Sequence, residues 1–566
     1  YEMSASLVGS EMCIRDSGFT HPDAVGEGYG LVYYPKWGAT AFDNGSFTVD
    51  YSFYVLDKGT VINTVNVTVD VPQYLVSSAE ELTNALNNVE TGDVIILQDN
   101  IATEGKVTTL RADSRDLDFT LDLNGFAITD RLDLRSTTVD NKESGYSLKV
   151  TVKNGTVGAA DESVYYGILL AGGNVDVTLY EVDSLGYYGG IYENGSWSGS
   201  SVTAEKCTFK GSDTAFGAYL PGGHKSTFTD CTFEGTVGAY VKSGNKTFNN
   251  CTITGNGEYI APSYNGNGAD GSGSGLVVDS TVGYQSPMVV TVNGGTISSV
   301  NGYAVEELSN AAEGVDKVCY SEVTVQGGTD LTGNALGDVY SENGVVTVID
   351  ENNAKSVYVG SAAAFQNLLS NPYKDGTAIV LCDNITGDKT DYDIKNTMNV
   401  NMTIDLNGYN LDGELNVRNK ASGLNYLMLT IKNGTIGSQT GYTAAGGMIW
   451  YGLMLEGSGK MTITIQNVDF VGYYGGYYEN GASNNVNTTV TVTDCSFKAA
   501  KNEEGAYTGY GAYMPGNYTV EFNRCVFEGS VGAYLKSGTR TFTDCTINGV
   551  YDKYVCLLYT SPSPRD

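Results

Sequence analysis

Tyrosines recur in short segments of this chain that otherwise carry small and apolar residues. The segments FGAYL (Phe216–Leu220) and VGAYV (Val237–Val241) each carry one. Since successive side chains of a strand point to opposite faces, Phe216, Ala218 and Leu220 should face inward and Tyr219 outward. Tyr240 should lie beside Tyr219, on the next strand. Exposed tyrosine rings offer apolar faces to sugar C–H groups and hydroxyls for hydrogen bonds, so the pattern predicts a carbohydrate platform.

A second region repeats this pattern and adds charged residues. The tyrosines there are Tyr513 and Tyr534, and YYGGYYENG adds Tyr477. A lysine follows the last tyrosine of each set by two residues, and a glutamate lies on the preceding strand. The predicted ligand-binding residues are Tyr219, Tyr240, Lys242, Glu193, Tyr477, Tyr513, Tyr534, Lys536 and Glu479. The alternative is that tyrosine is simply favoured on a solvent-facing sheet, where cross-strand pairs stabilise by about 0.5 kcal/mol each.

Residues that could catalyse a reaction are sparse. The chain has two histidines, His21 and His224. Lys242, Lys536 and Arg540 could act as bases, but the sequence places no evident carboxylate cage around them. The aspartates of the two DLNG segments, Asp122 and Asp405, have turn-flanking positions that favour a structural role. No catalytic residues and no cofactor are therefore predicted. Ca²⁺ stays open, because acidic side chains are its usual ligands but the spacing of an EF-hand loop is absent.

Composition limits the possible partners and the fold class. The net charge is −33, with 32 Lys and Arg against 65 Asp and Glu. Such acidity argues against nucleic-acid binding, which needs a basic surface. The chain contains 72 Gly, 41 Tyr and only 10 Pro, which favours an all-β protein rich in turns. No apolar run approaches the length of a transmembrane helix.

The chain contains an internal duplication. LDLNGFAITD (Leu121–Asp130) matches IDLNGYNLDG (Ile404–Gly413), and VGAYVKSGNKTFNNCTI (Val237–Ile253) matches VGAYLKSGTRTFTDCTI (Val531–Ile547). Within each copy, alternating strands and Gly/Asn turns recur every 20 to 30 residues or so, which suits a coil of stacked parallel strands. A β-sandwich is the competing architecture. We name residues 75–352 the first copy and residues 353–555 the second copy.

A short amphipathic helix is predicted at the start of each copy. SAEELTNALNNV (Ser78–Val89) has apolar residues at helical spacing and a capping-box pair, Ser78 and Glu81. AAAFQNLLSN (Ala362–Asn371) occupies the same place in the second copy. An open coil exposes apolar core and unpaired strands at its end, so a covering helix is physically expected.

Six cysteines recur in one pattern, as in KCTF, DCTF and NCTI. They are Cys207, Cys231, Cys251, Cys495, Cys525 and Cys545. No CxxC pair or Cys/His metal spacing accompanies them. We expect small buried side chains at equivalent strand positions, in preference to disulfides.

The order of covering helix, DLNG strand, NGTI turn and NCTF strand resembles the pectin-lyase-like right-handed β-helix family, in particular repeat proteins from the surfaces of gut bacteria. The resemblance implies an all-β fold of two tandem right-handed parallel β-helices, each with an N-terminal capping helix. This family includes lyases, hydrolases and non-catalytic adhesins, so the fold does not settle the function. The NTD, DD, GHG and RIK blocks of its hydrolases and the WIDH-like or RxPxxR stretches of its lyases are absent.

The two ends of the chain resemble translated sequencing adapter, because LVGSEMCIRDS (Leu7–Ser17) and CLLYTSPSPRD (Cys556–Asp566) can be encoded by opposite strands of one DNA segment. Residues 1–17 and 556–566 are therefore predicted not to be native. Residues 18–74 are predicted to belong to a preceding β-rich module, 75–352 to the first β-helix, and 353–555 to a second β-helix truncated at its C-terminal end.

These observations together predict an extracellular or cell-surface protein that binds carbohydrate or mediates adhesion. Its partners would be a polysaccharide or a host or bacterial surface glycan, with further domains of the same chain at both ends. One alternative is a polysaccharide lyase or glycoside hydrolase that acts on acidic polysaccharide. Another is a structural spacer within a larger surface protein.

Overall fold

The computed structural model describes residues 29–35, 46–57 and 60–550, with short gaps, and side chains from Tyr74 onward. The gaps are 104, 106, 195–198, 213–214, 224, 264–270, 281–287, 311–320, 334–335, 388–389, 396–398, 420–425, 458 and 481–486. The predicted adapter segments, 1–17 and 556–566, and both histidines lie outside the described residues.

Three antiparallel strands precede the first copy. They are β1 (Tyr29–Pro35), β2 (Ser46–Asp57) and β3 (Thr60–Val76), paired in that order. The end of β3 then pairs in parallel with β4 (Val94–Leu97), so this region leads directly into the parallel strands. The predicted strands before residue 75 are present, while their assignment to a separate module stays a prediction.

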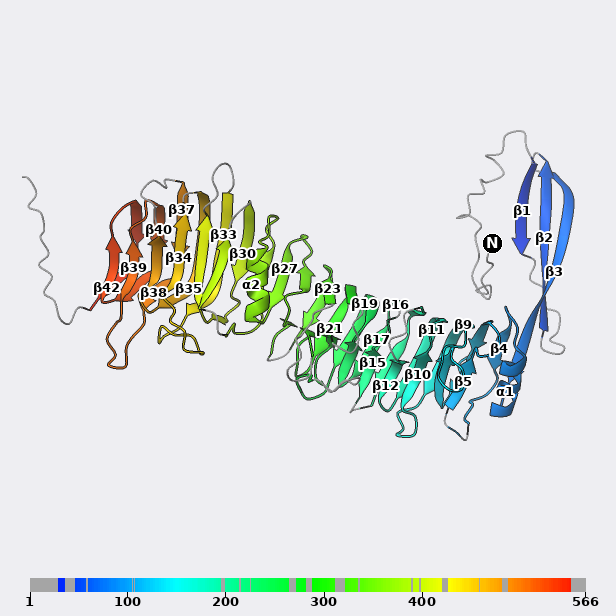
Figure 1. Ribbon diagram of the computed structural model, residues 1–566. Coiled ribbons are helices and arrows are strands. Elements are labelled where there is room, and N and C mark those ends of the chain that lie inside the picture. The colour runs from blue at the N-terminus through cyan, green and yellow to red at the C-terminus, as the bar shows by residue number, and fades with distance from the viewer. Residues whose placement is uncertain are drawn as a thin grey trace, which may run out of the picture.

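Most of the described chain forms long parallel sheets, with strands stacked side by side along an elongated body (Figure 1). One long sheet runs through both copies. Its strands in the first copy are β4, β6 (Leu117–Asp122), β7 (Ala127–Ile128), β9 (Leu148–Gly158), β11 (Val175–Gly186), β13 (Ser201–Glu205), β14 (Thr208–Gly211), β16 (Lys225–Thr229), β17 (Thr232–Gly235), β19 (Gly244–Gly255), β21 (Met288–Ser299), β23 (Ser321–Val325), β24 (Thr329–Thr332) and β26 (Val346–Ile349). In the second copy they are β27 (Lys355–Val359), β28 (Ala378–Leu381), β30 (Val400–Asp405), β31 (Asn410–Leu411), β33 (Tyr426–Gly437), β35 (Lys460–Gly472), β37 (Thr488–Thr493), β38 (Ser496–Ala499), β40 (Thr519–Asn523), β41 (Val526–Gly529), β43 (Thr539–Thr543) and β44 (Thr546–Gly549).

Each copy has a second, shorter parallel sheet, which we call the first and second short sheets. The first short sheet contains β5 (Val107–Arg111), β8 (Arg131–Arg135), β10 (Tyr166–Ala171), β12 (Gly189–Asn194), β15 (Phe216–Leu220), β18 (Val237–Val241), β20 (Leu276–Asp279), β22 (Val305–Leu308) and β25 (Val339–Ser341). The second short sheet contains β29 (Asp391–Lys395), β32 (Glu414–Asn419), β34 (Tyr451–Gly457), β36 (Gly475–Asn480), β39 (Tyr510–Met514) and β42 (Val531–Leu535). These stacked parallel sheets exclude the competing β-sandwich for the two copies.

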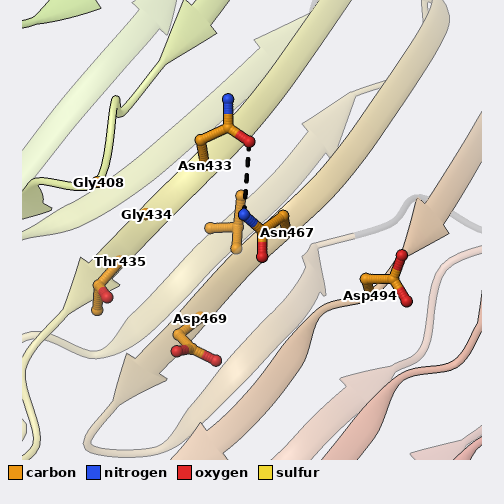
Figure 2. Close-up of a pocket in the computed structure, with 8 residues that line it drawn as sticks. Gly408, Asn433, Gly434, Thr435, Asn467, Asp469 and Asp494 are labelled. Atoms are coloured by element: carbon orange, nitrogen blue, oxygen red, sulfur yellow. Dashed lines mark hydrogen bonds between the residues drawn. The ribbon is translucent and has the colours of Figure 1, made fainter.

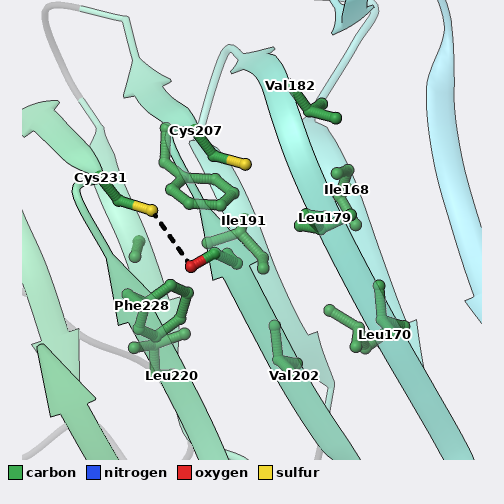
Figure 3. Packing of buried hydrophobic residues seen from close by; sticks show 14 of the residues in the cluster. Ile168, Leu170, Leu179, Val182, Ile191, Val202, Cys207, Leu220, Phe228 and Cys231 are labelled. Carbon is green, nitrogen blue, oxygen red and sulfur yellow. Dashed lines mark hydrogen bonds between the residues drawn. The ribbon is translucent and has the colours of Figure 1, made fainter. Parts of the chain in front are cut away.

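Apolar side chains fill the space between the long sheet and each short sheet. Figure 3 shows Leu179 and Val202 of the long sheet near Ile168 and Ile191 of the first short sheet. Two separate clusters form, one from Val76 to Val346 and one from Val359 to Phe527. The long sheet nevertheless continues between the two clusters, because β27 pairs antiparallel with β26 and parallel with β28. The described chain therefore has one continuous long sheet and two hydrophobic cores.

The recurring cysteines confirm the prediction of buried thiols at equivalent positions. All six are free, and all are buried except the half-buried Cys545. Their thiols donate to nearby backbone carbonyls, as Cys231 does to the oxygen of Ala204 at 3.6 Å (Figure 3). The small side chain fits a bend between two strands, where successive turns stack closely.

Both predicted helices are present at the start of their copies. The helix α1 (Ala79–Asn88) begins after Ser78, whose hydroxyl accepts the Glu81 N–H at 3.2 Å, and its Leu82 is buried in the first core. The helix α2 (Ala362–Ser370) begins after Ser361 and buries Phe365 and Leu369 in the second core. The sequence pattern thus placed both helices within one or two residues of their bounds. Neither described helix is long and apolar enough to cross a membrane.

Candidate functional site: two aromatic tracks

The face of each short sheet that points away from the core carries a register row of tyrosines. Tyr192 pairs with Tyr219, and Tyr219 with Tyr240, on adjacent strands of the first copy. The same row in the second copy is Tyr478, Tyr513 and Tyr534. Since flanking residues such as Ala218 and Leu220 belong to the core, alternation directs these tyrosines to the opposite face. The predicted direction of Tyr219, Tyr240, Tyr513 and Tyr534 is therefore correct. The inward direction predicted for Phe216 is wrong, because its ring packs against those of Tyr219 and Tyr240.

Further aromatic residues extend each row into a continuous series of ring contacts, which we call an aromatic track. The first track contains Tyr165, Tyr188, Tyr166, Tyr192, Tyr219 and Tyr240, with successive ring centroids 5.4, 6.4, 4.3, 5.2 and 6.0 Å apart. The second track contains Trp450, Tyr474, Tyr451, Tyr478, Tyr513 and Tyr534, with centroids 6.3, 6.3, 4.4, 5.7 and 5.4 Å apart. The two copies thus build the same aromatic arrangement.

Each track begins at an exposed aromatic pair on two successive turns of the coil. Tyr165 and Tyr188 are 51% and 45% exposed, and Trp450 and Tyr474 are 58% and 43% exposed. The Tyr188 N–H donates to the Tyr165 carbonyl at 2.7 Å, and Tyr474 donates to Trp450 at 2.8 Å. Backbone stacking therefore fixes both pairs in the same way.

The far ends of the tracks differ in exposure, and the prediction that Tyr219 and Tyr240 are exposed to solvent was wrong. Tyr219 is 5% exposed and Tyr240 is fully buried, whereas Tyr534 is 41% exposed. Tyr240 lies in a small cluster with Val237, Val277 and Leu308 on the outer side of the sheet. Strand alternation predicts which face a side chain takes, but it does not reveal what later covers that face.

The two predicted lysines also have different surroundings. Lys242 is buried, and its ammonium lies 3.9 Å from a carboxylate oxygen of Asp279, which also accepts the Tyr240 hydroxyl at 2.8 Å. Lys242 was expected to be accessible, and this expectation was wrong. Lys536 is exposed and lies over the rings of Tyr513 and Tyr534, 5.3 and 5.8 Å from their centroids.

Three other predicted ligand residues point into the core instead of outward. Tyr477 is buried in the second core, and its neighbour Tyr478 takes the outward place. Glu193 and Glu479 follow an outward tyrosine directly, so strand alternation turns their carboxylates inward, where both are fully buried. The prediction failed because a carboxylate was assumed to need solvent, although a buried carboxylate can be stable when it is paired.

Each inward glutamate has the same three kinds of partner. Glu193 binds the Lys246 ammonium at 2.7 Å, the Ser226 hydroxyl at 2.8 Å and the Gly222 N–H at 3.1 Å. Burial lowers the pKa of Lys246, and the Glu193 carboxylate opposes that shift.

In the second copy, Glu479 binds Arg540 at 2.5 Å, the Tyr477 hydroxyl at 3.0 Å and the Gly516 N–H at 3.1 Å. These enclosed pairs tie a strand of each short sheet to a later strand of the long sheet, β12 to β19 and β36 to β43. They are structural.

Charged residues lie on the same face, beside the start of the tyrosine rows. Arg131 lies near Tyr166 in the first copy, and Glu414 takes the matched position beside Tyr451 in the second. Glu414 accepts the Tyr451 N–H at 3.2 Å, and burial raises its pKa to about 7. Burial, followed by the neighbouring Tyr478 and Glu414, raises the pKa of Tyr451 to about 12, so its hydroxyl remains protonated.

A shallow polar groove follows the bends of the long sheet in the second copy (Figure 2). Its residues include Asn433, Asn467 and Asp494, which have φ of 61°, 55° and 56°. Asn467 donates to the Asn433 side chain at 3.5 Å, and Asp494 pairs with Arg524 at 2.6 Å. The groove is accordingly a row of stacked turns whose polar groups bond one another.

The DLNG aspartates belong to the same rows of turns. Asp122 accepts the Asn124 N–H at 2.9 Å and the Asn154 amide at 3.1 Å, and Asp405 accepts the Asn407 N–H and the Asn433 amide at 3.0 Å each. This confirms their predicted structural role. Among the residues that the structure describes, no group of three or more His, Cys, Asp or Glu side chains could hold a metal ion.

The exposed pairs at the start of the tracks were not predicted from the sequence. The signal was present, since GYYGG occurs at Gly186–Gly190 and at Gly472–Gly476 and its second tyrosine belongs to the pair in both copies. Their partners, Tyr165 and Trp450, stand in VYYGILL and IWYGLML, which also match between copies.

Comparison with known proteins gives little further information. No protein-family model and no curated protein matches this chain. Among solved structures, it is similar to a point mutant of the PL6 family alginate lyase AlyGC, with 11% sequence identity, 82% of this chain and 90% of that chain covered, and a TM-score of 0.17. A similarity at that TM-score supports no argument about function.

Proposed function

We propose that this chain binds carbohydrate through the two aromatic tracks, displayed by two tandem right-handed parallel β-helices. The observation that supports the proposal is the matched pair of exposed aromatic residues at the start of each track: Tyr165 with Tyr188, and Trp450 with Tyr474. Aromatic side chains of this size are costly to leave in water, and the same exposed pair is present in both copies.

Sugar rings fit such a surface because their C–H faces stack on aromatic rings while their hydroxyls reach polar groups at the edge. Two such tracks on one chain would allow a polymer to bind twice, which raises the overall affinity without new contacts. The proposed domains are residues 75–352 and 353–555, and the proposed setting is an extracellular or cell-surface protein.

The test is binding to a panel of immobilised glycans and soluble oligosaccharides. The variant Tyr165→Ala/Tyr188→Ala/Trp450→Ala/Tyr474→Ala should lose at least about tenfold in affinity, since one stacked sugar or base on an aromatic ring contributes roughly 1 kcal/mol or more. Tyr146→Ala removes an exposed tyrosine outside the tracks and serves as the control. Binding that is equal for the quadruple variant and the native chain would refute the proposal.

The same samples can be tested for catalysis. Unsaturated products or new reducing ends from alginate or pectin would support the alternative, a lyase or hydrolase. A chain that neither binds glycans nor cleaves them would favour a structural spacer.

A further inference from the structure

The enclosed ion pair of the first copy holds an amine against a carboxyl group. The Lys246 nitrogen lies 2.9 and 2.7 Å from Oε1 and Oε2 of Glu193, and neither side chain is exposed to solvent. Two contacts this short leave the nitrogen about 3 Å from the carboxyl carbon, which is the separation of reacting atoms before a bond forms. These two groups together contain every atom of an amide and one water molecule.

The Ser226 hydroxyl connects the same two groups by a second route. It accepts a hydrogen bond from the Lys246 ammonium at 3.1 Å and donates one to Glu193 Oε1 at 2.8 Å. A proton that moves along each of these bonds passes from the nitrogen to the carboxylate oxygen, so the hydroxyl can act as a relay. A relay is needed because the nitrogen must lose a proton before it can attack, and the oxygen must gain protons before it can leave.

The other carboxylate oxygen has a fixed backbone donor. The Gly222 N–H donates to Glu193 Oε2 at 3.1 Å, and the Gly222 carbonyl accepts a hydrogen bond from Lys246 at 3.2 Å. The N–H would stabilise the negative charge that gathers on Oε2 while the nitrogen adds to the carboxyl carbon. The carbonyl helps to hold the nitrogen beside that carbon.

Burial of the pair favours a neutral product. Glu193, Ser226 and Lys246 are all fully buried. Burial lowers the pKa of Lys246, while the Glu193 carboxylate opposes that shift. Two enclosed charges are costly even when they are paired, whereas an amide carries no charge.

The second copy keeps the frame of this site without its reactive groups. Glu479 again accepts a backbone N–H, that of Gly516, at 3.1 Å. Arg540 and Val520 stand in place of the lysine and the serine, and they pair with each other across β43 and β40. A guanidinium remains protonated and valine has no hydroxyl, so the nucleophile and the relay are both missing from the second copy.

We propose that Lys246 and Glu193 condense to an amide that links β19 covalently to β12, and that the second copy keeps its ion pair. The nitrogen adds to the Glu193 carboxyl carbon, the bond between that carbon and Oε1 breaks, and Oε1 leaves as water. Two of the three ammonium protons go to Oε1, and the third stays on the amide nitrogen. The two opposite charges cancel, so the step needs no oxidant, cofactor or other reagent.

The test is the mass of the whole chain and of its peptides. The native chain, kept folded at neutral pH, should be lighter than its sequence by the mass of one water. After unfolding and proteolysis, the peptides that contain Glu193 and Lys246 should remain joined, which distinguishes the amide from loss of water at an Asp-Gly sequence elsewhere. The peptides that contain Glu479 and Arg540 should separate, and they serve as an internal control.

Three variants test the roles of the side chains. Lys246→Arg keeps the cation but removes the nucleophile, so this variant should have its full sequence mass. In chains isolated unfolded and then transferred to native buffer, Ser226→Ala should form the bond at least about tenfold more slowly than the native chain, because the relay is lost. Lys225→Arg changes an exposed lysine beside Ser226 and should form the bond at the native rate.

A native chain that keeps its full sequence mass, with separate Glu193 and Lys246 peptides, would overturn the proposal. Loss of one water from Lys246→Arg with the same joined peptides would also overturn it, because the bond would then join other residues. Equal rates for Ser226→Ala and the native chain would overturn the relay. None of these measurements involves a glycan, so this proposal and the proposed function stand or fall separately.

Discussion

The two copies carry the same aromatic track but bury different amounts of it. In the first copy, β20 and β22 continue the short sheet beyond Tyr240, and Val277 and Leu308 pack over its ring. In the second copy, β42 is the last described strand of the short sheet, and Tyr534 lies on it half-exposed. The nearly identical segments VGAYV and VGAYL therefore give a buried tyrosine where later strands continue the short sheet and a half-exposed one on its last described strand.

The comparison also separates what each copy keeps from what it varies. The exposed pair, the ring spacings and the inward glutamate with its cationic partner are kept in both. The charges beside the track change, since Glu414 of the second copy takes the position that Arg131 has in the first. Contacts that stabilise the coil are therefore shared, while the charges beside the aromatic rows differ between the copies.

The largest expected effect comes from breaking the inward ion pair. Lys246→Met leaves the Glu193 carboxylate buried without its cation and should destabilise the first copy by about 3 to 5 kcal/mol. Arg540→Met should cost a comparable amount in the second copy, since Glu479 has an equivalent set of partners. Hydrogen exchange of peptides from each copy measures the loss separately.

Lys225→Met is the matched control, because Lys225 is exposed on the neighbouring strand position of the long sheet, and it should have almost no effect. Replacing both partners, as Glu193→Leu/Lys246→Met, should restore much of the stability. Similar exchange in Lys246→Met and in the native chain would show that the two enclosed pairs are not needed for folding.

A smaller effect should appear as a dependence of the stability of the second copy on pH. Burial raises the pKa of Glu414 to about 7, above its unfolded value, so the folded state holds this proton more tightly. The stability of the second copy should therefore fall by roughly 2 to 3 kcal/mol as pH rises from about 4.5 through 7.

Denaturant unfolding at a series of pH values measures this dependence. Glu414→Gln should reduce it without abolishing it, because burial also raises the pKa of Glu479 in the same copy to about 7. The first copy has its own buried carboxyl groups, since burial raises the pKa values of Glu306 and Glu307, so its stability should also fall as pH rises. An unchanged pH profile in Glu414→Gln would assign the dependence to another group.

The smallest expected effect tests the difference in cover directly. Tyr240→Phe removes a buried hydroxyl that donates to Asp279 at 2.8 Å and should destabilise the first copy by about 1 to 2 kcal/mol. Tyr534→Phe, at the matched exposed position, should stay within about 0.5 kcal/mol of the native chain. Equal losses in the two variants would contradict the difference in burial.

Much of the fold followed from pattern alone. The duplication, both covering helices, the parallel stacking and the buried cysteines each rest on residues close together in the chain, such as Ser78 with Glu81. The direction of Tyr219 followed from alternation with Ala218 and Leu220. The inward turn of Glu193 did not follow, because its partner Lys246 lies three turns of the coil away.

The sequence by itself determined the repeat, the strand faces and the aromatic content of both tracks, because these depend on local periodicity. The tertiary structure decided which of those aromatic side chains meet water and which charges meet each other. Exposure depends on what the following turns of the coil place over a side chain, and a buried charge is tolerated only where a distant residue arrives to neutralise it.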